Sequence, residues 1–121
     1  MNQTILIFGT LYGMLSVILG AFGAHALKKI LNQEQLKSFE TGVKYQMYHA
    51  LALLFLGSHF DKPNLIISWC FIIGILLFSF SIYGLVLSDA KGKKLRFLGL
   101  VTPLGGLLLI IGWFLLLLEV L

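Results

Sequence analysis

The sequence is poor in charged residues, in cysteine and in proline. Only 12% of its 121 residues are charged and 59% are hydrophobic, with two prolines in all. Soluble domains average roughly 25% charged residues. Cys70 is the single cysteine, so an intrachain disulfide, a CxxC motif and a cluster of thiol metal ligands are excluded. This composition excludes an ordinary soluble domain and indicates a chain adapted to lipid.

The chain also lacks the short motifs that accompany many enzyme reactions. It contains no nucleophile elbow, HExxH sequence, phosphate-binding loop or paired-carboxylate signature. We therefore expect a protein that is not an enzyme and that needs no cofactor and no metal ion. The net charge of +4 does not indicate nucleic acid binding, because the basic residues lie at the ends of apolar runs.

Four apolar runs account for nearly the whole chain. Each approaches or exceeds the roughly 20 residues that a helix needs to cross about 30 Å of hydrocarbon. The runs are about Thr4 to Leu27, Val43 to Phe60, Leu65 to Leu87 and Leu95 to Leu118. We predict a single all-α membrane domain over residues 1–121, a polytopic transmembrane four-helix bundle.

The basic residues predict how this bundle is oriented. Eight of the nine flank the first and third connections, and only Lys62 lies in the second. By the positive-inside rule, the first and third connections face the cytoplasm and both termini face outward. Basic clusters of this kind bind anionic headgroups of the inner leaflet. The residues expected at the headgroups are Lys28, Lys29, Lys91, Lys93, Lys94 and Arg96.

Small residues recur at helical spacing in the first and third runs, and two glycines are adjacent in the fourth. In lipid, helices associate through close van der Waals packing, which small residues allow. We predict helix packing at Gly9, Gly13, Ser16, Gly20 and Gly23, at Gly74 and Gly84, and at Gly105 and Gly106. A ligand groove along the first run is the alternative. Spare small-residue faces leave room for a homo-oligomer or a membrane-protein partner.

The second run is preceded by a polar, amphipathic stretch. Asn32 can cap a helix, and Gln35 three residues later fits a capping box. Leu36 and Phe39 then follow at helical steps, which predicts a short amphipathic helix in the interface before the second span. Gly42 is the expected bend, although the pattern does not decide whether the helix breaks there.

The candidate polar or ligand site lies at the start of the second span. Its members are His25, Glu40, Lys44, Gln46, Tyr48 and His49. Glu40, Lys44 and Tyr48 are spaced i, i+4, i+8 and share one helix face. A charge deep in a bilayer costs about 2.5–3.5 kcal/mol even on lenient scales. We therefore expect these groups to be wrapped by protein, to lie at headgroup depth or to line a wet cavity.

Several functions remain open for this polar site. An acid–base enzyme would use Glu40, Lys44 and His49, and a haem or metal site would need His25 and His49 to meet. A small transporter or channel would need an oligomer, because a short bundle fills its own centre with side chains. The preferred hypothesis is a non-enzymatic membrane protein that binds lipid or a protein partner and contributes to envelope integrity.

Two longer motifs resemble a known family. GAFGAHAL at residues 20–27 and FETGVKYQMYHALAL at residues 39–53 are similar to the YgdD/YwdK family of small bacterial membrane proteins. The likeness extends through LLFSFSIYGL at residues 76–85 and TPLGG at residues 102–106. The resemblance implies a four-span protein of the plasma membrane and supplies no settled activity.

Overall fold

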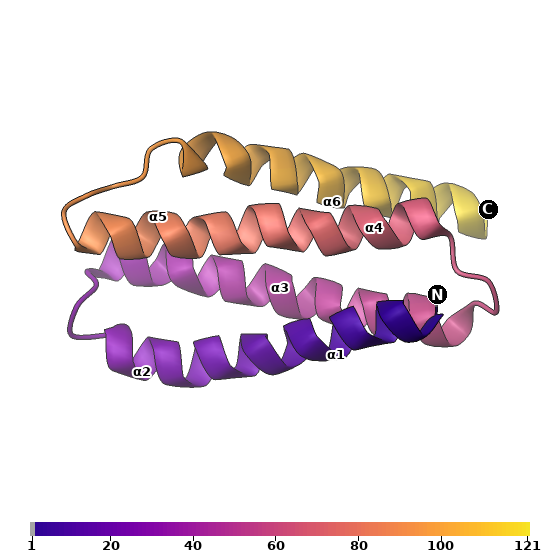
Figure 1. Cartoon of the computed structure of the whole chain (residues 1–121), viewed down its shortest axis with the longest axis horizontal. Coiled ribbons are helices and arrows are strands. Elements are labelled where there is room, and N and C mark those ends of the chain that lie inside the picture. Colours follow the sequence, from indigo (N-terminus) through magenta and orange to yellow (C-terminus); the bar gives the residue numbers. More distant parts are fainter. Residues whose placement is uncertain (1) are drawn as a thin grey trace.

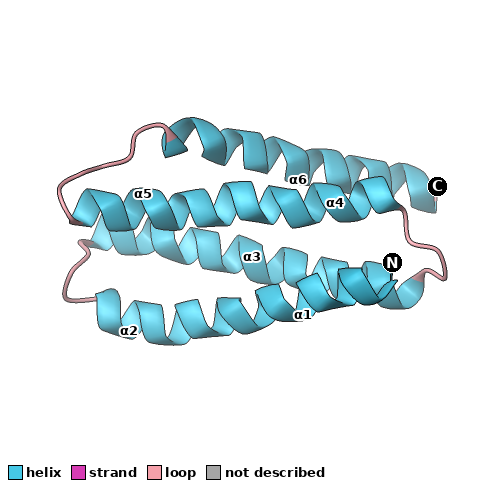
Figure 2. Cartoon of the chain, viewed as in Figure 1, coloured by secondary structure: helices cyan, strands magenta, loops and turns pink. Residues whose placement is uncertain are grey.

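The computed structural model describes residues 2–121, and every regular element in that range is helical (Figure 2). The elements join into four rods, two of which contain a π-helical segment. The rods are α1 (Asn2–Ile18), η1 (Leu19–Gly23) and α2 (Ala24–Leu27); α3 (Gln33–His59); α4 (Leu65–Ile75), η2 (Leu76–Phe80) and α5 (Ser81–Ala90); and α6 (Leu98–Val120).

The four rods lie side by side and run alternately up and down (Figure 1). The first rod packs on α3, and α6 packs on the third rod. In the middle, α3 also packs against α4, η2 and α5. Both termini lie at one end of the molecule, and the connections 28–32 and 91–97 lie at the other. We call this second end the lysine-rich end.

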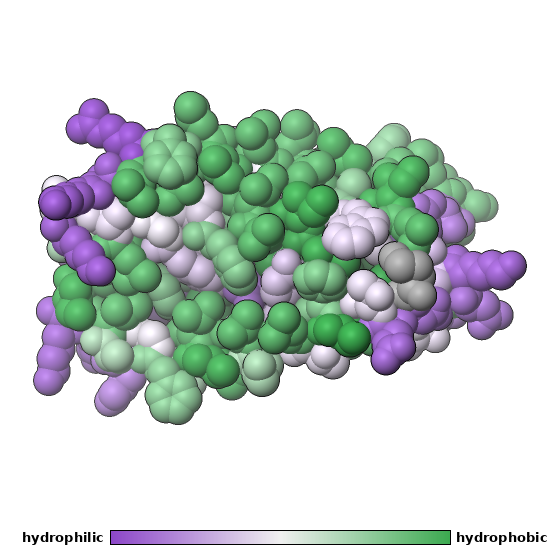
Figure 3. Space-filling view, in the orientation of Figure 1, coloured by the Kyte–Doolittle hydropathy of each residue, from purple (hydrophilic) through white to green (hydrophobic). Residues whose placement is uncertain are grey.

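Three rods are long and apolar enough to cross a membrane: Asn2–Leu27, Leu65–Ala90 and Leu98–Val120. Many of their large apolar side chains are exposed, including Phe22 and Leu100. Figure 3 shows the apolar surface as a broad middle band, with hydrophilic side chains gathered at the two ends. Soluble monomers rarely expose large continuous apolar surface, so this surface is typical of a protein surrounded by lipid.

The second predicted span lies inside α3, which begins at Gln33 rather than Val43. The capping box is confirmed, because Gln35 N–H donates to Asn32 Oδ1 at 2.8 Å and Asn32 N–H donates to Gln35 Oε1 at 3.0 Å. Charged residues occupy the first turns of this helix, so α3 is less apolar than the other rods.

The stretch expected to form a separate interfacial helix is the first part of α3, which is continuous through Gly42, where the sequence left open whether the helix breaks. Gly42 is buried, and its carbonyl accepts a 2.7 Å hydrogen bond from Ser79 Oγ. A Cβ at position 42 would lie 2.8 Å from Cε1 of Tyr83. The missing side chain therefore lets the third rod approach α3 closely.

The core is apolar and closely packed. Ile5, Leu53, Leu56, Phe71 and Ile75 are all at most 1% exposed and come from α1, α3 and α4. Every buried side-chain nitrogen or oxygen among the described residues has a hydrogen-bond partner. The interior is thus a filled contact region between rods.

The small residues lie where rods approach one another. Gly9, Gly13, Gly20 and Gly23 all face side chains or backbone of α3. Gly74 and Gly84 face Leu109 and Leu98 of α6. Gly105 faces the backbone of η2, and its neighbour Gly106 faces the Phe78 ring at ordinary contact distance. Ser16 is buried, and its Oγ donates to the Tyr12 carbonyl.

Candidate functional site

The residues of the predicted polar site divide into two groups. Gln46 is fully buried and His49 is 4% exposed, whereas Glu40, Lys44 and Tyr48 are exposed along the outer face of α3. His25 is exposed on α2 near the lysine-rich end. The six residues therefore do not form one site.

His49 is held by hydrogen bonds at both ring nitrogens. The Trp113 indole Nε1–H donates to His49 Nε2 at 2.9 Å, and His49 Nδ1 lies 2.6 Å from the Tyr45 carbonyl oxygen. An indole N–H can only donate and a carbonyl can only accept. Geometry thus assigns the neutral imidazole with its hydrogen on Nδ1. Coordination of a metal or haem iron by Nε2 would require the bond to Trp113 to break.

The rings around His49 belong to three rods. The Phe71 and Trp113 rings approach the imidazole edge-on, with centroids 5.4 Å and 5.8 Å away, and the Tyr45 ring lies nearly parallel to it. His49 therefore serves as a polar contact between α3 and α6 inside an aromatic cluster.

Gln46 connects three rods at the midpoint of α3. Its Nε2 donates to the Tyr12 carbonyl at 2.8 Å, and its Oε1 accepts from Tyr83 Oη–H at 2.7 Å. Tyr12 Oη–H in turn donates to the Ile72 carbonyl at 2.9 Å. Buried amides of this kind hold membrane helices together.

A cavity that the sequence did not predict lies at the lysine-rich end. It is a groove of about 590 Å³ between the first turns of α3, the last turns of α5 and the start of α6. We call it the α3–α5–α6 groove. Its lining residues are Asn32, Glu34, Gln35, Ser38, Thr41, Ile82, Leu85, Val86, Asp89, Lys94, Gly99, Thr102 and Pro103.

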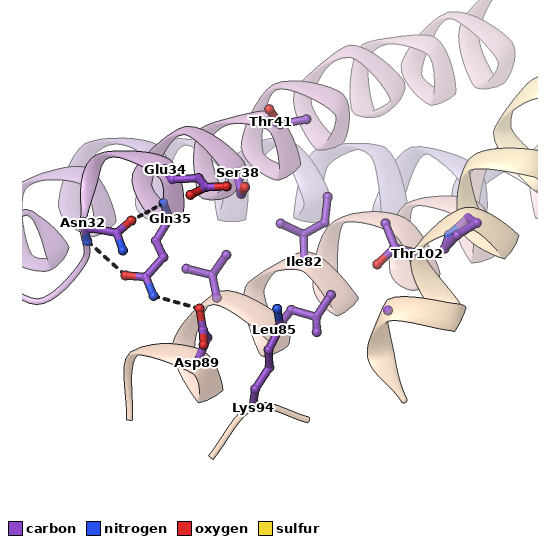
Figure 4. Close-up of a pocket in the computed structure, with 13 residues that line it drawn as sticks. Asn32, Glu34, Gln35, Ser38, Thr41, Ile82, Leu85, Asp89, Lys94 and Thr102 are labelled. Carbon is purple, nitrogen blue, oxygen red and sulfur yellow. Dashed lines mark hydrogen bonds between the residues drawn. The ribbon is translucent and has the colours of Figure 1, made fainter. Parts of the chain in front are cut away.

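Polarity changes along the groove. Its outer part carries Glu34, Asp89 and Lys94, which lie beside the connections (Figure 4). Its deeper part carries no charged residue: Ile82 lies there with Thr41 and Thr102, whose hydroxyls donate to carbonyls of their own helices. The direction of each helix determines this order, because α3 and α6 run inward from this end and α5 runs toward it. The groove is therefore amphiphilic along its length.

One hydrogen bond shapes the outer edge of the groove. Gln35 Nε2 donates to Asp89 Oδ2 at 3.0 Å and so joins α3 to α5 (Figure 4). Gln35 is also the second member of the helix cap. Gln35, which helps to cap the start of α3, thereby also positions an acidic side chain of the groove. The sequence signals that pointed to this region were the capping box and the basic cluster that contains Lys94.

The six predicted headgroup residues are all exposed and lie in or beside the two connections of the lysine-rich end. Five of them lie outside the groove, and Lys94 lines it. Figure 4 shows the Lys94 side chain extending from the connection after α5 toward the groove.

The fold and the apolar surface define the chain as a helical membrane protein. The family model described as "Protein of unknown function (DUF423)" matches residues 19–106. The UPF0382 membrane protein YwdK of Bacillus subtilis strain 168 is 40% identical over 116 residues, 92% of this chain and 90% of the relative. The UPF0382 membrane protein SH2409 of Staphylococcus haemolyticus is 39% identical over 117 residues, 94% of this chain and 92% of the relative.

This chain therefore belongs to the DUF423 family of UPF0382 membrane proteins, which confirms the predicted resemblance to YwdK. A third relative, UPF0382 membrane protein SAB0533 of Staphylococcus aureus strain bovine RF122, is 40% identical over 94% of this chain and 92% of its own length. No solved structure matches the chain.

Proposed function

We propose that this protein is a non-enzymatic integral protein of the bacterial plasma membrane that binds phospholipid and supports membrane integrity. The observation that carries the proposal is the α3–α5–α6 groove, whose outer part is charged and whose deeper part carries no charged residue. A phospholipid has the same order of polarity, from headgroup to acyl chain. The groove lies at the end where the basic residues gather, as expected for a headgroup region.

The proposal places all four rods across the bilayer, with the lysine-rich end in the cytoplasm. The 27 residues of α3 form a helix about 40 Å long at 1.5 Å per residue, which exceeds the roughly 30 Å of hydrocarbon. Its first turns, with Glu34 and Lys37, then project among the headgroups. The outer part of the groove lies at the same depth.

This placement accounts for the exposure of Lys44 without a protein shelter. Side chains on a helix tilt toward its N-terminus, and the N-terminus of α3 lies at the lysine-rich end. The Lys44 ammonium extends toward the headgroups while its methylene stem lies along lipid. Glu40 lies one turn nearer the interface on the same helix face.

Lipid retention by the full-length protein tests the proposal. An added Cβ at Gly99, which lines the groove, meets no atom within 4 Å. Gly99→Phe therefore places a ring in the groove without a collision at its Cβ. We expect Gly99→Phe, purified in mild detergent, to have lost most of the phospholipid that mass spectrometry finds on the wild-type protein.

The matched control is Leu100→Phe, at a neighbouring α6 residue that is 75% exposed and does not line the groove. This variant should retain phospholipid as the wild type does. Equal retention by wild type, Gly99→Phe and Leu100→Phe would contradict a binding groove.

A second candidate function is transport by an oligomer, which the exposed polar face of Glu40, Lys44 and Tyr48 favours. Several copies could line a path with this face. Flux of ions and small solutes through proteoliposomes, lost in Lys44→Met and kept in Lys37→Met, would support transport. Flux equal to that of empty vesicles would contradict it.

A further inference from the structure

The charge of the α3–α5–α6 groove is opposite to that of its surroundings. The lysine-rich end and its adjoining turns hold eight basic residues, of which only Lys94 lines the groove. Three carboxylates occur there, and two of them, Glu34 and Asp89, line the groove. The third, Glu40, is exposed on α3 and does not line it. The groove thus combines two carboxylates and one ammonium at an end that is otherwise strongly basic.

The two carboxylates come from different rods. Glu34 belongs to the first turn of α3, and Asp89 belongs to the last turn of α5. Figure 4 shows them on opposite sides of the outer groove, with Lys94 entering from the connection. The bond from Gln35 engages Asp89 at Oδ2 only, and a carboxylate has further lone pairs that accept hydrogen bonds. The groove therefore presents acceptors for a cation beside one donor for an anion.

We infer that this groove selects the headgroup of a zwitterionic phospholipid with a primary amine, of the ethanolamine class. This inference rests on the proposed function, because it names the lipid that the groove binds. The lipid ammonium donates hydrogen bonds to Glu34 and Asp89, and Lys94 donates to the phosphate. Charge-assisted bonds of this kind are roughly twice as strong as neutral ones.

Other common headgroups lack part of this match. An anionic glycerol headgroup brings no cation. The carboxylates of Glu34 and Asp89 then repel its phosphate, and Lys94 is the one basic residue that lines the groove. A choline headgroup carries a cation without N–H donors and cannot form the hydrogen bonds. One acyl chain of the lipid lies along the uncharged deeper groove, against Ile82, Leu85 and Pro103.

Competition among lipids tests the inference on the full-length protein. The protein is mixed in detergent with equimolar ethanolamine, glycerol and choline phospholipids of identical chains, and bound lipid is measured by native mass spectrometry. We expect the ethanolamine lipid to be bound about tenfold more than either of the others, since one lost charged hydrogen bond corresponds to roughly that factor.

Matched variants assign the preference to the groove. Glu34→Gln and Asp89→Asn keep the side-chain size and should each reduce the preference for the ethanolamine lipid to about twofold or less. Glu40→Gln removes an equal charge from the outer face of α3 and should leave the preference unchanged. Lys94→Gln should reduce binding of the ethanolamine lipid, whereas Lys93→Gln should not.

A variant that reverses the lipid preference gives a further test, because a misfolded protein would lose binding of both lipids. Glu34→Lys places a second cation in the outer groove and should shift binding toward the glycerol phospholipid. Wild-type protein that binds the glycerol lipid as well as the ethanolamine lipid, or an equal loss in Glu40→Gln and Glu34→Gln, would overturn the inference. Displacement of the lipid by an equal concentration of soluble phosphoethanolamine would overturn the assignment to a lipid.

The failure of this inference is distinguishable from failure of the proposed function. If all three lipids bind equally and Gly99→Phe removes them all, the groove binds lipid without headgroup selection and only this inference fails. If Gly99→Phe leaves binding of all three unchanged, both fail.

Discussion

The indole Nε1–H of Trp113 donates a 2.9 Å hydrogen bond to Nε2 of His49, which lies 64 residues earlier in the chain. This bond joins α6 to α3 in aromatic surroundings, and His49 is 4% exposed. A polar pair in a bilayer has little access to water as an alternative partner. The bond should therefore contribute measurably to the stability of the fold.

We predict that Trp113→Phe lowers the free energy of unfolding by about 1 kcal/mol, because His49 Nε2 loses its donor. Trp69→Phe is the control. Trp69 is 40% exposed and Trp113 is 47% exposed, and the indole N–H of Trp69 has no hydrogen-bond partner within residues 2–121. Unfolding by a denaturing detergent, followed by circular dichroism, measures both variants. Equal losses in the two would show that the bond itself contributes nothing.

A double-mutant cycle on Gln46 and Tyr83 tests the buried network. Gln46→Leu leaves the Tyr83 hydroxyl without an acceptor, and Tyr83→Phe leaves Gln46 Oε1 without a donor. Each change should destabilise the protein by about 1–3 kcal/mol. The double variant should destabilise the protein by less than the sum of the two single changes, by about 0.6 kcal/mol, the average coupling of such bonds between membrane helices, and by at most about 1.7 kcal/mol.

Tyr48→Phe serves as the surface reference for this cycle, because Tyr48 is 55% exposed on the same helix. Its effect should stay within about 0.5 kcal/mol. Strict additivity of Gln46→Leu and Tyr83→Phe would contradict direct coupling between the two side chains.

The positions of the helices were largely predictable from the sequence. Apolar runs predicted three rods that agree closely with Asn2–Leu27, Leu65–Ala90 and Leu98–Val120, because a helix in lipid needs a long uncharged stretch. Asn32 and Gln35 also predicted the start of α3. Whether the helix breaks at Gly42 was not predictable, since a glycine inside a helix pattern is compatible with either a break or a close contact, and α3 is continuous there.

The candidate site was not predictable in the same way. Glu34, Asp89 and Lys94 are separated by up to 60 residues, and periodicity along one helix does not say which faces of two helices meet. The hydrogen bond between His49 and Trp113 was unpredictable for the same reason, because it depends on which faces of α3 and α6 pack together. The π-helical segments Leu19–Gly23 and Leu76–Phe80 also lack a sequence signature that we recognised.

Thiol labelling tests the orientation in the membrane. In a Cys70→Ala background, a single cysteine at Lys93 should be protected from an impermeant reagent in intact cells, and one at Lys62 should react. Both positions are exposed at opposite ends of the molecule. After the membrane is made permeable, both should react. Labelling of position 93 in intact cells would reverse the proposed orientation.

The close approach of α6 to η2 depends on the absence of a side chain at Gly105. At Gly105, an added Cβ would collide with the backbone nitrogen of Phe78 and lie 2.7 Å from the carbonyl carbon of Leu77. At Gly106, the nearest atom would be Cδ1 of Phe78 at 3.5 Å, an ordinary contact. Backbone atoms cannot rotate away as a side chain can, so Gly105→Ala must separate the two rods.

We expect Gly105→Ala to destabilise the protein by about 1–3 kcal/mol or more, the usual cost of overpacking. Gly106→Ala should be neutral or slightly stabilising, because alanine gains about 0.5–1 kcal/mol over glycine inside a helix. Each variant adds one methyl group, at adjacent positions, so composition and hydropathy cannot explain a difference in stability between them. Equal stability of the two variants in detergent unfolding would contradict the contact between Gly105 and η2, and with it the packing that places α6 at the edge of the groove.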